Sequence, residues 1–248
     1  MTGRVFLALL LPLLAAGTSD PNELHPADCA DIYRNGQTLS GVYYIYLSDY
    51  TPVQVYCDMG TLGGSLKDAM WTVFQRRMDG SVNFYRPWEK YKKGFGNKHG
   101  EYWLGLENLF HLTLRKKYEL RVDMQDWDGG WASAQYSSFS VDPESYGYTL
   151  HVNGFIDGGA GDSLEYHNGQ KFTTFDRDQD AASRYNCAAR HRSAFWFQAC
   201  QKSNPTGLYL WGHDDSGSRT GVLWSHWKGY DYSLKFISMK IRPVSSAV

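Results

Sequence analysis

The sequence predicts a mixed α+β domain, because β-strand signals recur along the whole chain and the helical signals between them are brief. The strand signals are runs rich in β-branched and aromatic residues, and several alternate between apolar and polar positions. Turn-forming residues are never far apart, and the glycines show no collagen-like period. A hydrophobic content of 42% with 16% aromatics excludes a disordered chain and allows the 248 residues to bury a sizeable core.

The expected elements follow from these patterns in chain order. Strands are predicted at 42–46, 53–56, 71–77, 118–124, 148–152 and 234–241. The Asp79-Gly80 turn also predicts that 71–77 forms a hairpin with 82–85. Short helices are predicted at 87–92 and 106–112. The long loops between these elements are expected to be functional or tied down by other contacts, and the chain has no internal repeat.

Residues 1–17 have the pattern of a secretory signal peptide. Arg4 precedes an apolar run at 5–14, and small residues follow at 15–17. The alternative, a membrane anchor, needs about 20 apolar residues, and this run is shorter. Residues 18–27 are polar with two prolines and are expected to form a short leader. No later segment is apolar enough to cross a bilayer, so we expect a secreted protein without a membrane span.

Secretion favours disulfides, and the four cysteines form an even set that allows three pairings. The short spacings favour Cys29 with Cys57 and Cys187 with Cys200. No C-x-x-C is present, which argues against a zinc site or a thioredoxin-like motif. No cysteine remains for linking chains.

The run 175–180 is the best local signal for a binding site, because three carboxylates alternate within it. Calcium takes six to eight hard oxygen ligands from carboxylates and backbone carbonyls, and such a loop can supply several of them. An EF-hand is excluded, because Ala181 and Cys187 stand at its glycine and glutamate positions. The alternative is a solvated acidic loop, and the motif by itself does not decide between the two.

Other function classes find little support in the sequence. A net charge of −1 excludes a globally basic nucleic-acid binder. The run 161–164 (GDSL) matches a hydrolase signature, but no histidine has an aspartate three residues before it, so a turn is the favoured interpretation. No H-E-x-x-H exists, and we expect a protein that is not an enzyme.

Several ordered motifs resemble the fibrinogen C-terminal-like domain family. They are 84–88 (FYRPW), 94–96 (GFG), 100–108 (GEYWLGLEN), 176–180 (DRDQD), 186–188 (NCA), 195–197 (FWF) and 239–243 (MKIRP). The resemblance covers about 28–244. It implies an α+β globular fold of three subdomains, with a mixed or antiparallel sheet, long loops and two disulfides between neighbouring cysteines. Relative to the family, 65–70 is an insertion expected to form a surface loop.

The resemblance also implies one Ca²⁺ ion near the C-terminal binding face. The family binds it through the second and third aspartates of the run, which here are Asp178 and Asp180. Asp176 would then be a supporting loop residue. Two backbone carbonyls complete the protein ligands. Counting from Asp180 gives Ala182 and Arg184, whereas counting back from the third cysteine gives residues 183 and 185.

Lectin-like members of the family bind acetyl groups in a pocket beside the calcium. The matching positions here are His191, Gln201, Ser218, Arg219 and Tyr230. They depart from the family pattern, since His191 replaces a frequent Tyr and Gln201 replaces the usual His. The altered set would suit anionic or polar ligands through the guanidinium. By the same resemblance, the peptide bond between residues 199 and 200 is expected to be cis.

Two functions from different classes follow from the resemblance. The sequence is most similar to family members of the extracellular matrix, which implies a calcium-binding recognition protein that binds elastin- or collagen-type fibres and supports cell adhesion. The alternative is an innate-immune lectin for acetylated or anionic glycans. Assembly would be non-covalent, through symmetric contacts between copies.

Overall fold

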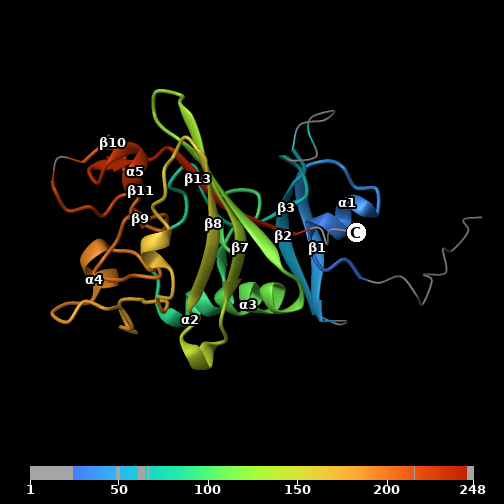
Figure 1. Cartoon of the computed structure of the whole chain (residues 1–248), viewed down its shortest axis with the longest axis horizontal. Helices are drawn as coiled ribbons and strands as arrows, with labels where there is room; N and C mark the ends of the chain where they lie inside the picture. The colour runs from blue at the N-terminus through green and yellow to red at the C-terminus, as the bar shows by residue number, and fades with distance from the viewer. Residues whose placement is uncertain (1–24, 49–50, 61–64, 66–67, 215, 245–248) are drawn as a thin grey trace, which may run out of the picture.

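A twisted antiparallel sheet forms the centre of the protein in the computed structural model, which describes residues 25–48, 51–60, 65, 68–214 and 216–244 (Figure 1). Its main strand order is β1-β2-β3-β13-β6-β7-β8, with the short β4 and β5 attached beside β3. The main strands are β1 (Gly41–Ser48), β2 (Thr51–Asp58), β3 (Trp71–Arg77), β6 (Tyr118–Gln125), β7 (Trp131–Val141), β8 (Leu150–Gly158) and β13 (Phe236–Pro243). The C-terminal strand β13 is therefore central, between β3 and β6.

Short helices and two-residue strands complete the fold. The helices are α1 (Cys29–Arg34), α2 (Trp88–Lys93), α3 (Leu106–Arg115), α4 (Cys187–His191) and α5 (Ser225–Lys228), with 3₁₀ turns η2 (Glu144–Tyr146) and η3 (Glu165–His167). The short strands are β4 (Phe95–Gly96), β5 (Tyr102–Trp103), β9 (Ser203–Asn204), β10 (Gly212–His213), β11 (Leu223–Trp224) and β12 (Tyr232–Ser233). Figure 1 shows α1 with β1 and β2 on one side, the long strands with α2 and α3 in the middle, and a loop-rich lobe containing α4 and α5 on the other side. This division agrees with the predicted three-part α+β domain.

Aromatic side chains make up much of the core. The Trp103 ring contacts Tyr91, Phe172 and Trp196 at centroid distances of 5.4, 5.6 and 6.1 Å. The indole N–H of Trp103 donates to the Tyr91 carbonyl oxygen at 2.9 Å, so its one polar atom is satisfied inside the core. Most of the aromatic content therefore serves packing, as the motifs of the family resemblance indicate.

The main strand and helix predictions are largely confirmed, but α1, α4, α5 and the two-residue strands were not predicted. The β7 strand was not predicted, because its polar and small residues hide the alternation. The predicted hairpin between 71–77 and 82–85 is wrong, since β3 pairs with β2, β13 and β5 instead. The buried carboxylate of Glu101 accepts the backbone N–H groups of residues 78–80 and 82, so these donors are not available to a second strand.

The favoured cysteine pairing is confirmed by two disulfides, Cys29–Cys57 and Cys187–Cys200. The first joins α1 to β2, and the second joins α4 to the loop before β9. Because the sequence has four cysteines, no thiol remains for a disulfide between chains.

Buried side chains tie down the loops of the C-terminal lobe. The Thr206 hydroxyl donates to the Ala194 carbonyl at 2.6 Å, and the Asn204 amide donates to the Gly221 carbonyl at 3.1 Å. Both residues are fully buried, and their bonds replace the ladder that a regular sheet would provide. The lobe can therefore hold its surface loops in fixed positions with little secondary structure.

The predicted signal peptide at 1–17 and most of the leader lie outside the described residues. Of the predicted surface loop at 65–70, residues 66 and 67 also lie outside them. In the part of the protein that is described, no helix has the length and apolarity needed to span a bilayer.

Candidate functional site

The predicted acidic loop and the predicted pocket residues both lie in the C-terminal lobe, joined by α4. Asn186 caps this helix by accepting the Ala189 N–H at 2.7 Å, and its amide donates to the Thr174 carbonyl at 2.9 Å. One side chain therefore fixes the start of α4 to the loop that carries the aspartates. The Cys187–Cys200 disulfide joins the same helix to the pocket wall.

Asp178 and Asp180 lie next to each other, as the calcium prediction requires. The Asp180 backbone N–H donates to Asp178 Oδ1 at 3.3 Å, while the Asp180 carboxylate accepts the N–H groups of Ala182 and Cys187 at 2.9 and 2.7 Å. Burial raises the pKa of Asp180, and the neighbouring negative charge of Asp178 raises it further. None of the ion pairs within the described residues includes either carboxylate.

The donor chemistry of this loop fits a hard divalent cation. A cation between the two carboxylates would relieve the repulsion that opposes their ionisation. Among the residues that the structure describes, no cluster of three or more His, Cys, Asp or Glu side chains is present, so backbone carbonyls would have to complete the shell. Ala182 and Arg184 follow on the same loop, and their assignment as carbonyl ligands stays a prediction.

Asp176 has a separate structural role. Its carboxylate accepts the Trp88 N–H at 2.9 Å and the Thr174 hydroxyl at 2.7 Å. It therefore links the acidic loop to the start of α2, and its supporting role beside a calcium ion stays a prediction.

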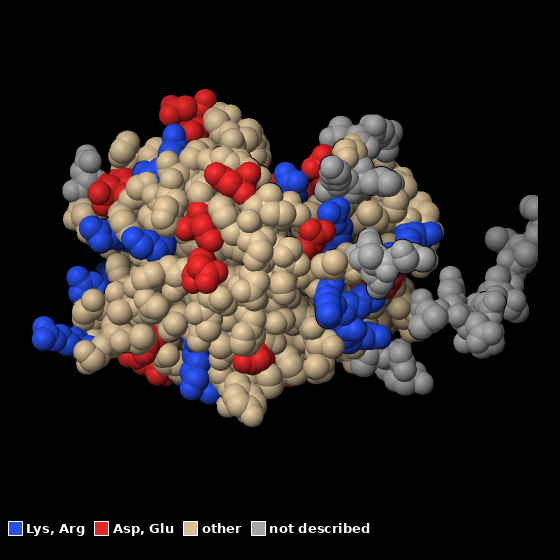
Figure 2. All heavy atoms as spheres, viewed as in Figure 1, with Lys and Arg blue, Asp and Glu red and all other residues tan. Residues whose placement is uncertain are grey.

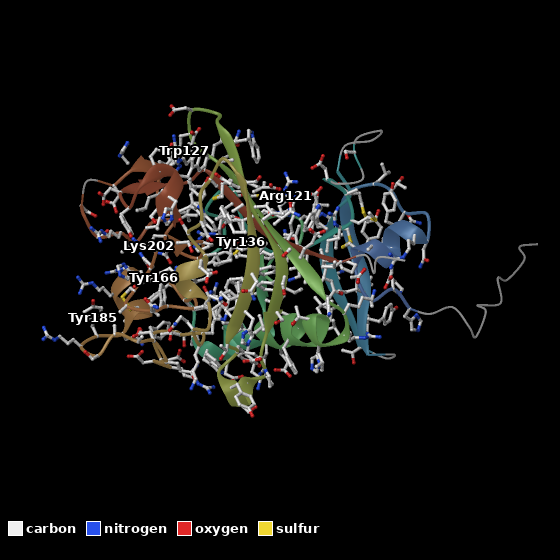
Figure 3. The ribbon with its side chains drawn as sticks, in the orientation of Figure 1. Arg121, Trp127, Tyr136, Tyr166, Tyr185 and Lys202 are labelled. Atoms are coloured by element: carbon white, nitrogen blue, oxygen red, sulfur yellow. A yellow bond between two sulfur atoms is a disulfide. The ribbon has the colours of Figure 1, made fainter. Side chains whose placement is uncertain are left out.

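A pocket of about 590 Å³ opens on the lobe, and all five predicted pocket residues line it. The complete lining is Tyr166, Tyr185, Arg190, His191, Ala199, Cys200, Gln201, Lys202, Gly217, Ser218, Arg219 and Tyr230. Figure 3 shows Tyr166, Tyr185 and Lys202 on the same side of the molecule, beside α4. The bond between Ala199 and Cys200 is cis, as expected. Arg190 and Lys202 were not predicted as pocket residues. Their only signal in the sequence is adjacency, because Arg190 directly precedes His191 and Lys202 directly follows Gln201.

The pocket lining is cationic. Arg190, Lys202 and Arg219 contribute positive charge, and none of the lining residues that the structure describes is acidic. Figure 2 shows basic side chains gathered at the edge of the molecule where α4 lies. The Arg190 guanidinium lies 4.5 Å from the Tyr185 ring centroid, and that of Arg219 lies 4.5 Å from Tyr230. The tyrosine rings hold the two guanidinium groups without neutralising them.

Backbone anchoring fixes the position of Arg219. Its carbonyl accepts the Gln201 amide at 2.8 Å and lies 3.2 Å from His191 Nδ1, which acts as the donor. Arg219 has a φ of 53°, in the left-handed region that is unfavourable for most side chains. Burial and the nearby arginines lower the pKa of His191, which favours its neutral form at neutral pH. His191 and Gln201 therefore hold the backbone of Arg219 in place.

His167 supports the pocket from behind, and the sequence prediction missed it. Its Nδ1 donates to the Trp196 carbonyl at 2.6 Å, while Nε2 accepts the N–H groups of Lys202 and Ser203 at 3.1 and 3.2 Å. Complete burial lowers the pKa of His167 to about 4, so the ring is neutral at neutral pH. A single histidine gives no recognisable pattern in a sequence, because its role depends on two distant backbone segments, at residue 196 and at residues 202–203.

The 161–164 run does not form a hydrolase site. Ser163 is fully buried, and its Oγ lies 2.9 Å from His226 Nδ1 while also accepting the His226 backbone N–H. Asp162 accepts the hydroxyl of Tyr136, which Figure 3 labels within the strands, and the N–H of Leu164. Ser163 therefore joins this loop to α5, and its Oγ is closed to a substrate.

Comparisons with known proteins agree with this geometry. A profile of the family described as fibrinogen beta and gamma chains, C-terminal globular domain, matches residues 25–244. The protein is 51% identical to microfibril-associated glycoprotein 4 of Bos taurus over 98% of this chain and 99% of that protein. It is 54% identical to the Homo sapiens protein of the same name over 88% of this chain and 85% of that protein. It is 52% identical to fibrinogen C domain-containing protein 1 of Mus musculus over 87% of this chain but only 47% of that protein.

Solved structures have the same fold. The fibrinogen-like globe domain of human ANGPTL2 matches with a TM-score of 0.83 and 44% identity, over 88% of this chain and 99% of that chain. A lamprey fibrin D-dimer in complex with a Gly-His-Arg-Pro-amide peptide matches with a TM-score of 0.81 and 33% identity, over 90% of this chain and 75% of that chain. The fold and the resemblance expected from the sequence motifs are therefore confirmed.

Proposed function

Because the protein belongs to the family defined by the C-terminal globular domain of fibrinogen beta and gamma chains, we propose that it is a secreted, non-enzymatic recognition protein of the extracellular matrix that binds calcium and matrix fibres and supports cell adhesion. The observation that carries this proposal is the similarity to microfibril-associated glycoprotein 4 over nearly the full length of both proteins. The name of that relative associates it with microfibrils, and we infer a partner for this protein among elastin- or collagen-type fibres.

Calcium would be bound by Asp178 and Asp180, with carbonyl oxygens from Ala182 and Arg184. The closeness of the two carboxylates and the raised pKa of Asp180 support this assignment. The ion would hold the loop against α4, because Asp180 already accepts the N–H of Cys187 at the start of that helix. The Cys187–Cys200 disulfide joins the start of α4 to the pocket wall, so calcium bound at the loop would also stabilise that wall.

Isothermal titration with Ca²⁺ tests the metal site. We expect Asp178→Ala to abolish calcium binding, since one of two carboxylate ligands is lost. Asp231→Ala is the matched control, because Asp231 is an exposed carboxylate of the same lobe outside the loop. Unchanged affinity in Asp178→Ala would contradict the assignment.

Pulldown on elastin-type and collagen fibres, with calcium and with chelator, tests fibre recognition. The proposal predicts retention on one fibre type that falls on chelation and in Asp178→Ala. Equal, negligible retention in both conditions would exclude matrix binding, whatever the titration shows. Assembly would be non-covalent, since both disulfides lie within one protein molecule, and light scattering of the purified protein would report it.

The cationic pocket favours a second candidate function, a lectin for anionic glycans. Sulfate or carboxylate groups fit the lining of Arg190, Lys202 and Arg219 better than a neutral acetyl group does. A glycan array should therefore show signals for sulfated or carboxylated glycans that Arg219→Ala removes and Lys90→Ala, an exposed control on α2, leaves unchanged. Signals confined to neutral acetylated sugars would refute the anionic preference.

A further inference from the structure

A trough lies on the exposed face of the sheet over β6, β7 and β8, away from the pocket beside α4 (the C-terminal pocket). Its floor is formed by short side chains in register, with Asp123 opposite Ser133, and the row continues under cover to the buried Ser238 on β13. The row ends at Gly158, where a Cβ would lie only 2.0 Å from Ser133 Oγ. A cavity of about 270 Å³ opens here, lined by Arg121, Asp123, Trp131, Ala132, Ser133 and Gly158.

One wall of the trough is aromatic. Phe236, Gln125 and Trp131 form the next row across β13, β6 and β7, and the Trp131 ring lies 5.5 Å from the Phe236 ring. Trp131 is nevertheless 61% exposed, so most of its indole face meets solvent. A large exposed aromatic beside a cavity is typical of a contact surface for a ligand, because removing the ring from water on binding is favourable.

The opposite wall is formed by long side chains. Lys240, Arg121 and Gln135 stand in register on β13, β6 and β7, and Ile156 extends the row on β8 with 55% exposure. The cavity itself is lined from three adjacent strands, β6, β7 and β8, which are spaced about 4.8 Å apart, so it spans about 10 Å across the sheet. That length suits a short run of linked sugar units lying across the strands.

The charged groups of the trough are already paired with each other or with neighbouring carboxylates. Arg121 contacts Asp123 at 2.7 Å and Asp68 at 3.0 Å, and Lys240 contacts Asp58 and Asp123. A ligand anion would have to compete with these carboxylates, in contrast to the pocket in the C-terminal lobe, whose described lining residues include no carboxylate. The trough therefore offers hydrogen-bonding groups without an attraction for either sign of charge.

From these features we propose that the trough is a second carbohydrate site, which binds a neutral oligosaccharide independently of the C-terminal pocket. A hexose ring presents C–H groups on its face and hydroxyls at its edge. The face would stack on Trp131, and the hydroxyls would bond to Asp123 and Ser133 on the floor. Figure 3 shows Arg121 over the strands, well apart from the pocket residues Tyr166, Tyr185 and Lys202.

Titration calorimetry of the full protein with cellohexaose, mannohexaose, laminarihexaose and maltohexaose, in chelator, tests the proposal. We expect at least one of them to bind, with affinity reduced about tenfold or more in Trp131→Ala, a change that is equivalent to about 1.4 kcal/mol. Trp131→Tyr should retain much of the affinity, because it keeps an aromatic face. Trp211→Ala is the matched control, since Trp211 is also exposed, at 74%, but lies outside the trough.

Three outcomes would overturn the proposal. No binding of any of the four sugars at millimolar concentration would exclude a neutral oligosaccharide, and equal affinity in Trp131→Ala would exclude the trough. Loss of binding in Arg219→Ala but not in Trp131→Ala would assign the sugar to the pocket instead. Because the assay contains chelator, failure of the calcium proposal would not affect its result.

Discussion

Replacing Glu101 by glutamine should strongly destabilise the protein, because its carboxylate organises a buried junction. Glu101 is fully buried, and Oε1 lies 3.5 Å from the Nε atom of the equally buried Arg77. The same carboxylate accepts four backbone N–H groups, from Met78, Asp79, Gly80 and Val82 at 2.8, 3.1, 2.9 and 3.1 Å. Arg77 also donates to the Gly207 carbonyl, so the junction connects the sheet to the C-terminal lobe.

The magnitude follows from the groups left unpaired in Glu101→Gln. The amide keeps one oxygen for residues 78–80, but its NH₂ group faces the Val82 N–H, which loses its acceptor. Arg77 also loses its counter-charge while remaining buried. Removing one partner of a buried ion pair costs about 3–5 kcal/mol, and the lost charge-assisted hydrogen bond is part of that cost. We therefore expect a loss of about 4 kcal/mol.

Urea unfolding followed by circular dichroism measures this loss, and calorimetry should show a Tm lower by about 10 °C for a domain of this size. Glu89→Gln is the control, because the Glu89–Lys93 pair is exposed, with side chains 63% and 75% accessible. Its free energy of unfolding should change by less than about 0.5 kcal/mol. A loss below about 1 kcal/mol in Glu101→Gln would show that the junction does not depend on the carboxylate charge.

Three further predictions concern buried and cross-linked groups. Between pH 6.5 and about 4, the unfolded protein binds a proton at His167 that the folded protein excludes. The free energy of unfolding should therefore fall with decreasing pH by up to about 1.4 kcal/mol per pH unit. Urea titrations in which His167→Gln shows the same pH dependence as the unchanged protein would contradict this. Burial lowers the pKa of Lys98 to about 8, so more of its amine is neutral at pH 7.5 than that of the exposed Lys90. A limiting dose of acetic anhydride at this pH should therefore acetylate Lys98 before Lys90. Peptide mass spectrometry showing the reverse order would refute this. Removing Cys187 and Cys200 together by serine substitution should cost about 3 kcal/mol on the chain-entropy account of a short loop, and an unchanged urea midpoint would argue against it.

Much of the fold could be predicted because its signals are local. The alternation of apolar and polar residues in 118–124 directly indicates that one face of β6 is buried. The helix at 106–112 is likewise recognisable from its own sequence. The hairpin at 71–85 was mispredicted for the opposite reason. Its turn residues are genuine, but their N–H groups bond to Glu101, about twenty positions away, and no local rule contains that contact.

The candidate site divides in the same way. Asp178 and Asp180 stand two residues apart, so the sequence alone places their carboxylates together, and the structure adds only their backbone partners. The trough has no equivalent sequence signal. Trp131 and Arg121 are paired with their neighbours only after β6, β7 and β13 have assembled in register.

Local sequence signals were sufficient to predict most of the main strands and helices, the pairing favoured by cysteine spacing, the acidic loop and, through its motifs, the family. Periodicity, turn chemistry and short spacings decide these features, and each acts within a few residues. Packing of distant segments brings Arg190, Lys202 and Arg219 into one pocket whose described lining has no carboxylate, and it places His167 behind that lining. The charge and burial of the pocket residues depend on which distant segments become neighbours. Packing of the whole core decides this, because no segment by itself contains those contacts.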